Sequence, residues 1–231
     1  MADGTWIELE VADGTTMAAY VARPAAEKAP GILVFQEAFG VNSYIRSICD
    51  RLAAEGWNAL APEVYHRTAP PHFEAPYGDR SVMAPHFQAL NQENLLVDIA
   101  ASYSFLEHDP ATNGVIDVIG FCMGGRVAFL AATAVRVHAA VSFYGGGIAP
   151  NLLPRVSSLS APILMFWGGL DQHIPPAQHR AVADALRGAQ RDFVDVEISY
   201  ADHGFFCDQR ASFNERAAAE AWPLTLAFLR R

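Results

Sequence analysis

Short apolar segments alternate with amphipathic segments from residue 31 to the end of the chain, and this alternation constrains the fold more than any other feature. The apolar segments have strand length and little polar alternation, which is typical of strands covered on both faces. Strands are predicted at residues 31–36, 58–61, 115–120, 139–144, 163–167 and 193–200. Helices are predicted between Asn42 and Gly56, over 87–107, 123–135 and 177–187, and from Ser212 onward. The alternation predicts an α/β fold with a mostly parallel central sheet and helices on both faces, in a single domain over residues 1–231.

Two segments depart from this alternation. Thr5–Val11 and Thr16–Ala22 flank the turn signal Asp13-Gly14, which predicts an N-terminal β-hairpin. Residues 66–86 are rich in proline and are predicted to form a long loop or a cap. Loops of this length in compact domains tend to be functional.

Charge and composition exclude several classes of partner. The 231 residues include 16 Lys and Arg against 25 Asp and Glu, which gives a formal net charge of −9. Nucleic acids and anionic membranes attract basic patches, and the basic residues here are scattered, so neither is expected as a partner. No apolar run approaches the ~20 residues that span a bilayer, and the first residues do not resemble a signal peptide. We expect a cytoplasmic monomer that acts on a small molecule.

Cysteine usage and motif content argue against metals and cofactors. Cys49, Cys122 and Cys207 are odd in number and widely spaced, unlike a disulfide framework or a zinc site. The sequence contains neither HExxH nor GxGxxG. We expect no metal and no cofactor. Cys49 is expected to be a buried apolar side chain, whereas Cys122 has different neighbours.

The strongest local signal for chemistry is Gly120-Phe121-Cys122-Met123-Gly124-Gly125. It lies between a predicted strand and a predicted helix, which is the setting of a nucleophile elbow. Glycines allow the sharp turn that holds the central side chain at the carboxyl edge of the sheet. The helix start offers backbone N–H groups and a partial positive charge, which favour a thiolate and an oxyanion. Cys122 is therefore the predicted nucleophile.

A nucleophile of this kind needs a base, and the base needs an acid that orients it. In chains with such an elbow the order is nucleophile, acid, histidine. Asp171 and His203 follow Cys122 in this order, each just beyond the end of a predicted strand, where parallel sheets place their ligands. Asp171 is the predicted acid and His203 the predicted base. Three competitors lie nearby in the sequence: His173, His179 and Asp202.

Four segments recur in a recognisable order: Gln36-Glu37-Ala38-Phe39-Gly40-Val41-Asn42, Gly120–Gly125, Gly168-Gly169-Leu170-Asp171 and His203-Gly204-Phe205. These segments resemble those of the dienelactone hydrolase (carboxymethylenebutenolidase) family, a branch of the α/β-hydrolases with a cysteine nucleophile. The resemblance extends along nearly the whole chain. The resemblance implies an α/β-hydrolase fold and a triad of Cys122, His203 and Asp171. It also implies an oxyanion hole made by the backbone N–H groups of Met123 and Ala38.

The resemblance assigns a further role to Glu37. In the family, the matching glutamate contacts the resting thiol and helps to deprotonate it when substrate arrives. Glu37 is unusual in its own right, because it ends an apolar strand, where an unpaired charge is costly.

The sequence departs from the family in the part that binds a substrate carboxylate. Members that cleave dienelactones use two arginines, one of them four residues after the catalytic histidine. Here that position is Cys207, and the nearest arginine is Arg210. The other arginine is predicted in the 66–86 segment at Arg80, with Arg67 as the alternative.

These features predict a metal-independent hydrolase of esters or lactones, with Tyr144 and Phe205 lining an aromatic part of its pocket. An enol-lactone releases a stabilised enolate, which favours a lactone over a simple alkyl ester. Two rival functions remain open. One is a general carboxylesterase or thioesterase for neutral acyl substrates, and the other is a non-catalytic binding module that keeps the fold.

Overall fold

The computed structural model describes residues 4–231. Residues 1–3, to which the expectation of no signal peptide partly refers, lie outside this range. The described residues divide into two compact units, the first ending at Asp117 and the second running from Val118 to Arg231. The boundary falls inside a strand, so no linker separates the units.

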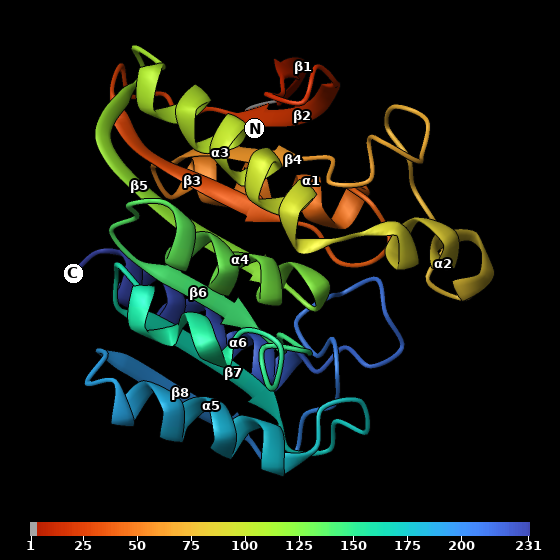
Figure 1. Ribbon diagram of the computed structural model, residues 1–231, viewed down its shortest axis with the longest axis vertical. Helices are drawn as coiled ribbons and strands as arrows, with labels where there is room; N and C mark the ends of the chain where they lie inside the picture. Colours follow the sequence, from red (N-terminus) through yellow and green to blue (C-terminus); the bar gives the residue numbers. More distant parts are fainter. Residues whose placement is uncertain (1–3) are drawn as a thin grey trace. The chain divides into compact units, whose positions relative to one another are not determined.

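The first unit is built on four strands paired in the order β1-β2-β4-β3 (Figure 1). Their bounds are β1 Thr5–Glu10, β2 Thr16–Ala22, β3 Ala29–Phe35 and β4 Asn58–Pro62. β1 and β2 pair antiparallel, which confirms the predicted hairpin, and β2 and β4 also pair antiparallel. β3 and β4 are parallel and almost fully buried, as their unbroken apolar sequences predict.

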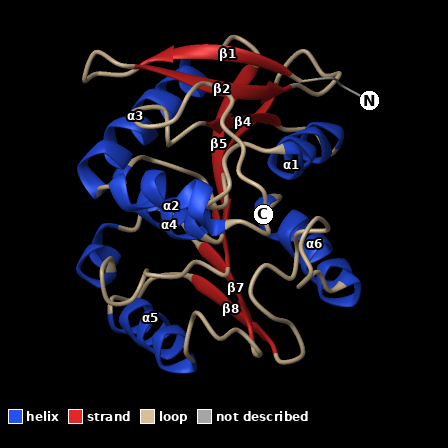
Figure 2. Ribbon diagram, turned by 90° about the vertical axis from the view of Figure 1, so that its right-hand side faces the viewer, coloured by secondary structure: helices blue, strands red, loops and turns tan. Residues whose placement is uncertain are grey.

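Three helices accompany these strands: α1 Ser43–Ala54, α2 Arg80–Ala89 and α3 Gln92–His108. In Figure 2, α1 covers one face of the strands of this unit and α3 covers the other. Asn42 caps α1, because its side chain accepts a hydrogen bond of 3.2 Å from the backbone N–H of Ile45. Gly56 follows the helix with a φ of +104°, a left-handed conformation that glycine adopts without strain.

The structure corrects the prediction for residues 66–107. The segment 66–86 is not a loop throughout, because Asp79 caps α2 by accepting a 2.9 Å hydrogen bond from the N–H of Ser81. α2 ends at Ala89, and Asn91 then caps α3 by accepting a 2.8 Å bond from the N–H of Asn94. The cap at Asn91 therefore divides the predicted helix over 87–107, and the cap at Asp79 starts a helix inside the segment predicted as a loop or cap.

The second unit contains four parallel strands in the order β5-β6-β7-β8. Their bounds are β5 Thr112–Phe121, which begins in the first unit, β6 Ala140–Phe143, β7 Ile163–Gly168 and β8 Phe193–Ile198. The helices are α4 Met123–Ala134, α5 Pro176–Gly188 and α6 Glu215–Leu229, with a short 3₁₀ helix at Leu153–Ser158. Figure 2 shows α4 and α5 on one face of these strands and α6 on the other.

The last helix begins later than its sequence predicts. α6 starts at Glu215, and Asn214 caps it by accepting a 3.0 Å hydrogen bond from the N–H of Ala217. Ser212 lies outside the helix. Parallel strands, an antiparallel hairpin and helices on both faces confirm the predicted α/β class.

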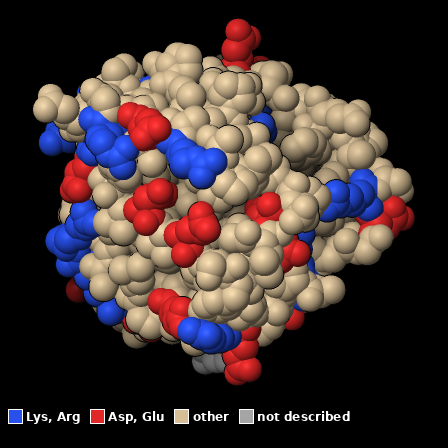
Figure 3. Space-filling view, turned by 90° about the horizontal axis from the view of Figure 1, so that it is seen from below, with Lys and Arg blue, Asp and Glu red and all other residues tan. Residues whose placement is uncertain are grey.

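Charged side chains of both signs share the face drawn in Figure 3, where Lys and Arg are interspersed with Asp and Glu. On this face the basic side chains form no continuous area of the kind that binds nucleic acid. Within residues 4–231, no helix is both long and apolar enough to cross a membrane.

Asp98 on α3 binds two residues that follow β4. Arg67 donates to both carboxylate oxygens of Asp98, at 2.8 and 2.9 Å, and its Nε donates to Asp13 at 2.8 Å. His66 Nε2 lies 3.1 Å from Asp98 Oδ1. The Asp98 side chain is fully buried, whereas 18% of the Arg67 side chain is exposed. This cluster ties the segment after β4 to α3 and to the hairpin turn.

Asp98→Ala should lower the free energy of unfolding by about 3–5 kcal/mol, because it leaves the partly buried guanidinium of Arg67 without its carboxylate. Urea denaturation followed by circular dichroism measures this loss. Asp184→Ala is the control, since Asp184 and its partner Arg187 are 73% and 67% exposed and the change should stay within about 0.5 kcal/mol. Equal stability of the two variants would contradict a supporting role for the buried cluster.

Candidate active site

Cys122 is the single residue between the end of β5 at Phe121 and the start of α4 at Met123. Its φ of +56° is unusual for a residue with a side chain and marks a strained turn. Its N–H donates a 3.0 Å hydrogen bond to the carbonyl of Phe143 in β6, and its carbonyl accepts one of 3.0 Å from the N–H of Gly125. Cys122 therefore has the strand–turn–helix setting that its sequence predicts, with its backbone held on both sides.

The glycines around Cys122 have no room for a side chain. A Cβ at Gly120 would lie 1.9 Å from the carbonyl oxygen of Gly124, and one at Gly125 would lie 2.6 Å from the carbonyl oxygen of Phe143. Both clashes are with backbone atoms, which cannot move aside cheaply. The close packing of strand and helix thus leaves Cys122 as the side chain that projects from the turn.

Cys122, His203 and Asp171 form a chain of polar contacts. His203 Nε2 lies 3.1 Å from Cys122 Sγ, and His203 Nδ1 lies 2.7 Å from Asp171 Oδ2. The other oxygen of Asp171 accepts the backbone N–H groups of His173 at 2.7 Å and Ile174 at 3.1 Å. The loops after β7 and β8 thus bring together the three residues predicted to act as nucleophile, base and acid.

The three competitors have other surroundings. Asp202 Oδ1 accepts the backbone N–H of His203 at 2.6 Å and so caps a turn. His179 is buried, stacks on Trp167 with ring centroids 4.7 Å apart, and lies 3.0 Å from the carbonyl of Ile174 through Nε2. His173 is exposed, and its ring meets that of His203 edge to face at 5.3 Å.

Burial and neighbouring groups shift the pKa values of His203 and Asp171 in opposite directions. Burial disfavours the charged form of His203, but the sulfur of Cys122 and the hydrogen bond to Asp171 outweigh it and raise the pKa of His203 to about 10. Burial also disfavours the charged form of Asp171, yet the hydrogen bond to His203 and two backbone N–H groups keep the pKa of that carboxyl below its usual range. An imidazolium beside a sulfur atom favours the thiolate.

Glu37 and Ala38 belong to the first unit, where both are buried just beyond β3. The carbonyl of Ala38 accepts a 3.1 Å hydrogen bond from the hydroxyl of Tyr65. Their roles toward Cys122, and the role of the Met123 N–H, remain predictions.

The arginines considered for a substrate carboxylate have different settings. Arg67 is bound to Asp98 and Asp13, as described above. Arg80 is exposed at the first position of α2. Arg210 lies close to the residue after His203, since a Cβ at Gly204 would be 2.4 Å from Arg210 Nη1. Substrate binding by Arg80 remains a prediction.

Tyr144 and Phe205 are fully buried and pack against each other with ring centroids 5.4 Å apart. Tyr144 also lies 5.1 Å from the His203 ring. Its φ of +39° is a feature that sequence reasoning missed, although the three glycines that follow it signalled a sharp turn. The contact of either ring with a substrate remains a prediction.

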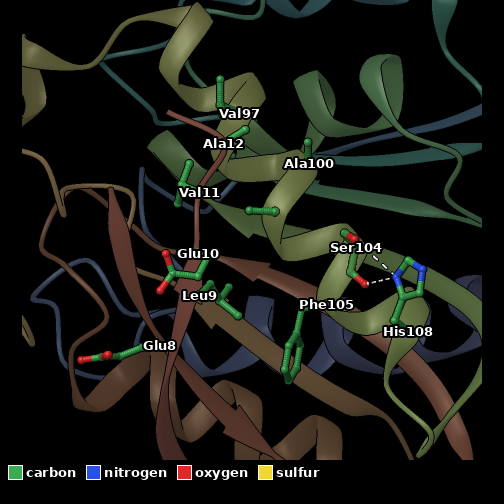
Figure 4. A pocket seen from close by; sticks show the side chains of 11 residues that line it. Glu8, Leu9, Glu10, Val11, Ala12, Val97, Ala100, Ser104, Phe105 and His108 are labelled. Carbon is green, nitrogen blue, oxygen red and sulfur yellow. Dashed lines mark hydrogen bonds between the residues drawn. The ribbon is translucent and has the colours of Figure 1, made fainter. Parts of the chain in front are cut away.

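The first unit carries an open groove of about 640 Å³ between β1 and α3 (Figure 4). Its lining includes Ser104 and His108 but none of the predicted site residues. Ser104 Oγ is 3.3 Å from His108 Nδ1, but the same nitrogen is 2.8 Å from the carbonyl of Ser104, to which it donates. A nitrogen that donates to a carbonyl cannot accept the serine proton, so this pair is a helix-surface contact. Elsewhere too, the part of the chain that the structure describes holds no group of three or more His, Cys, Asp or Glu arranged for a metal ion.

Comparison with known proteins identifies the family of the chain. The sequence model of the dienelactone hydrolase family matches residues 17–231. A provisionally named carboxymethylenebutenolidase of Synechocystis sp. is 37% identical over 218 residues, which cover 89% of this chain and 88% of that protein. The carboxymethylenebutenolidase of Pseudomonas putida is 32% identical over 225 residues, which cover 96% and 94%.

Solved structures extend the likeness to the fold. The crystal structure of a provisionally named dienelactone hydrolase from Klebsiella pneumoniae matches with a TM-score of 0.87 and 32% identity, over 99% of both chains. Because sequence and structure match along nearly the whole chain, the protein belongs to the dienelactone hydrolase family, a family of hydrolases with the α/β-hydrolase fold.

Proposed function

We propose that the protein hydrolyses ester or lactone bonds with Cys122 as its nucleophile. The observation that carries this proposal is the contact chain Cys122 Sγ, His203 and Asp171, with its sulfur at the tip of a strained elbow. A nucleophile within hydrogen-bond reach of a base, which a carboxylate in turn orients, is the arrangement that acyl transfer requires.

In the first half of the reaction the thiolate of Cys122 attacks the acyl carbon, and the carbonyl oxygen becomes an oxyanion. The N–H groups of Met123 and Ala38 are proposed to hold this oxyanion, each donor contributing roughly 3–4 kcal/mol. The carbon–oxygen bond then breaks, and the leaving oxygen takes the proton from His203. In a lactone this oxygen stays tethered to the acyl group.

In the second half, His203 takes a proton from water, and the hydroxide attacks the thioester carbon. The carbon–sulfur bond breaks, the acid product leaves, and the imidazolium–thiolate pair is restored. Asp171 holds the tautomer of His203 and the place of its Nδ1 throughout. We further propose a small-molecule lactone or ester as substrate, a cytoplasmic location and a monomeric state.

Cys122→Ala should lower kcat/KM for a p-nitrophenyl ester by about 10³-fold or more, because it removes the attacking atom. Cys122→Ser should keep a small part of the activity, since the elbow is unchanged but a hydroxyl depends more on the base. Cys49→Ala is the control, because Cys49 is fully buried and burial raises the pKa of its thiol. Comparable turnover by Cys122→Ala and wild type would rule out the proposed nucleophile.

The raised pKa of His203 predicts a flat alkylation profile for Cys122. His203 should keep its proton up to about pH 10, so the positive charge beside Cys122 Sγ stays constant and the rate with iodoacetamide should change little between pH 6 and 9. In His203→Ala this positive charge beside the sulfur is lost, and alkylation at pH 6 should fall about 100-fold. A wild-type rate that rises about tenfold per pH unit from pH 6 to 8 would contradict the imidazolium–thiolate pair.

The resemblance offers a second acceptor for the thiol proton, Glu37. If Glu37 and not His203 takes the thiol proton in the free enzyme, Glu37→Gln should slow alkylation of Cys122, since it removes the acceptor and keeps the shape. Glu63→Gln is the matched control, because Glu63 is another buried carboxyl of the first unit. Equal alkylation profiles for wild type and Glu37→Gln across pH 6–9 would remove Glu37 from the mechanism.

A further inference from the structure

Tyr144 combines a strained backbone with a fully buried ring. It directly follows β6, and its φ of +39° lies in the left-handed region, which bulky side chains rarely adopt. Strain of this kind persists only where the surroundings enforce it, and it clusters at functional sites. A tyrosine at this position therefore suggests that its side chain has a role that a glycine could not fill.

The strain has a visible origin in the turn that follows. The N–H of Tyr144 donates a 2.7 Å hydrogen bond to the carbonyl of Phe166, so the residue is still tied to β7. A Cβ at Gly145 would lie 2.5 Å from Ser142 Oγ and 3.0 Å from the backbone nitrogen of Arg126 in α4. The chain therefore has to turn sharply at Tyr144 to pass the first turn of α4.

The sequence of this turn is rich in glycine except at the strained position, which carries a tyrosine. Glycine occupies positions 145, 146 and 147, yet the position with the unfavourable φ carries a tyrosine. A glycine there would remove the strain. The turn sets this φ, and a tyrosine occupies the position although a glycine would fit without strain, which points to a role for the ring.

The Tyr144 ring contacts the base of the proposed site. Its centroid lies 5.1 Å from that of His203, with a tilt of 59°, and 5.4 Å from that of Phe205. Contacts of this distance and tilt between aromatic rings are favourable. Tyr144 has no exposed surface, and the exposed His173 meets the same His203 ring edge to face.

The hydrogen bonds of His203 do not by themselves restrain rotation of its ring. Its Nδ1 is held by Asp171 at 2.7 Å and its Nε2 by Cys122 at 3.1 Å, so the two contacts act at opposite ends of the ring. They fix where the two nitrogens lie, but they resist rotation of the ring about the line between its partners only weakly. Packing against the ring is what restrains that tilt.

We propose that Tyr144 is a positioning residue, whose strained backbone presses its ring against His203 and so keeps Nε2 aligned with Cys122 Sγ. This inference rests on the proposed function of the Cys122–His203 pair. It assigns Tyr144 no contact with substrate.

Alkylation of Cys122 by iodoacetamide tests the proposal without any substrate. In Tyr144→Leu the rate at pH 7 should fall about 10-fold or more, since a misplacement of 1 Å can cost up to 10²-fold. Its pH profile should move from the flat form toward that of His203→Ala. Tyr144→Phe keeps the ring and should stay within about twofold of wild type.

Two further variants separate positioning from general packing. Tyr144→Gly suits the backbone at this position, and it should lose alkylation rate as Tyr144→Leu does, which also covers the case in which the leucine variant does not fold. Phe166→Leu removes another fully buried ring of the second unit, one that stacks on Phe143 at 4.5 Å. It should lower thermal stability but leave the alkylation profile unchanged.

Several outcomes would overturn the proposal. Wild-type alkylation in Tyr144→Leu and Tyr144→Gly would exclude it, as would equal losses in Phe166→Leu. A raised KM for esters with unchanged alkylation would make Tyr144 a substrate contact instead. A loss in Tyr144→Phe as large as in Tyr144→Leu would assign the effect to the hydroxyl and not to the ring. Failure of the proposed function is seen separately, as full ester turnover in Cys122→Ala.

Discussion

The close approach of backbone to backbone at the β5–α4 turn is the constraint on which the site depends. A Cβ at Gly120 would lie 1.9 Å from the carbonyl oxygen of Gly124, and one at Gly125 would lie 2.6 Å from that of Phe143 at the end of β6. This packing forces the positive φ of Cys122 and leaves one side chain to project from the turn. It also forces the chain after β6 to turn at Tyr144, because Gly145 must pass the start of α4. Two strained residues at the ends of neighbouring strands therefore have the same steric cause.

The site also depends on the charges of Asp171 and His203. Asp171 is buried but accepts two backbone N–H groups and one histidine, so its charge is well compensated. That charge and the sulfur of Cys122 raise the pKa of His203 to about 10. The shift contributes stability that is fully present below the ordinary histidine pKa of about 6.5 and is lost as the pH rises through about 10. Cys49 shows the opposite case, since burial and the negative charge of Asp50 raise the pKa of its thiol more than Arg46 lowers it.

Sequence reasoning identified the class of fold and singled out Cys122, Asp171 and His203, which the structure brings into contact. It was weaker where one side chain decides between two local structures. Apolar spacing predicted a single helix over 87–107, whereas the caps at Asp79 and Asn91 produce two. Capping depends on a hydrogen bond of one side chain, which a periodic pattern averages out. The choice between Asp171 and Asp202 also depended on single side chains, because both residues follow parallel strands. The Asp171 carboxylate contacts the ring of His203, whereas that of Asp202 accepts the backbone N–H of His203.

The sequence by itself determined the strand–helix alternation, the glycines of the elbow and the family, because each of these follows from residue types at fixed spacings along the chain. The tertiary structure alone decided that His203, 81 residues after Cys122, places Nε2 3.1 Å from the sulfur, and that Asp171 rather than Asp202 orients it. It also decided that Arg67 binds Asp98, and that Tyr144 adopts a strained conformation against His203. These are contacts between residues far apart in the chain, and their distances depend on how strands and loops pack, which no local pattern encodes.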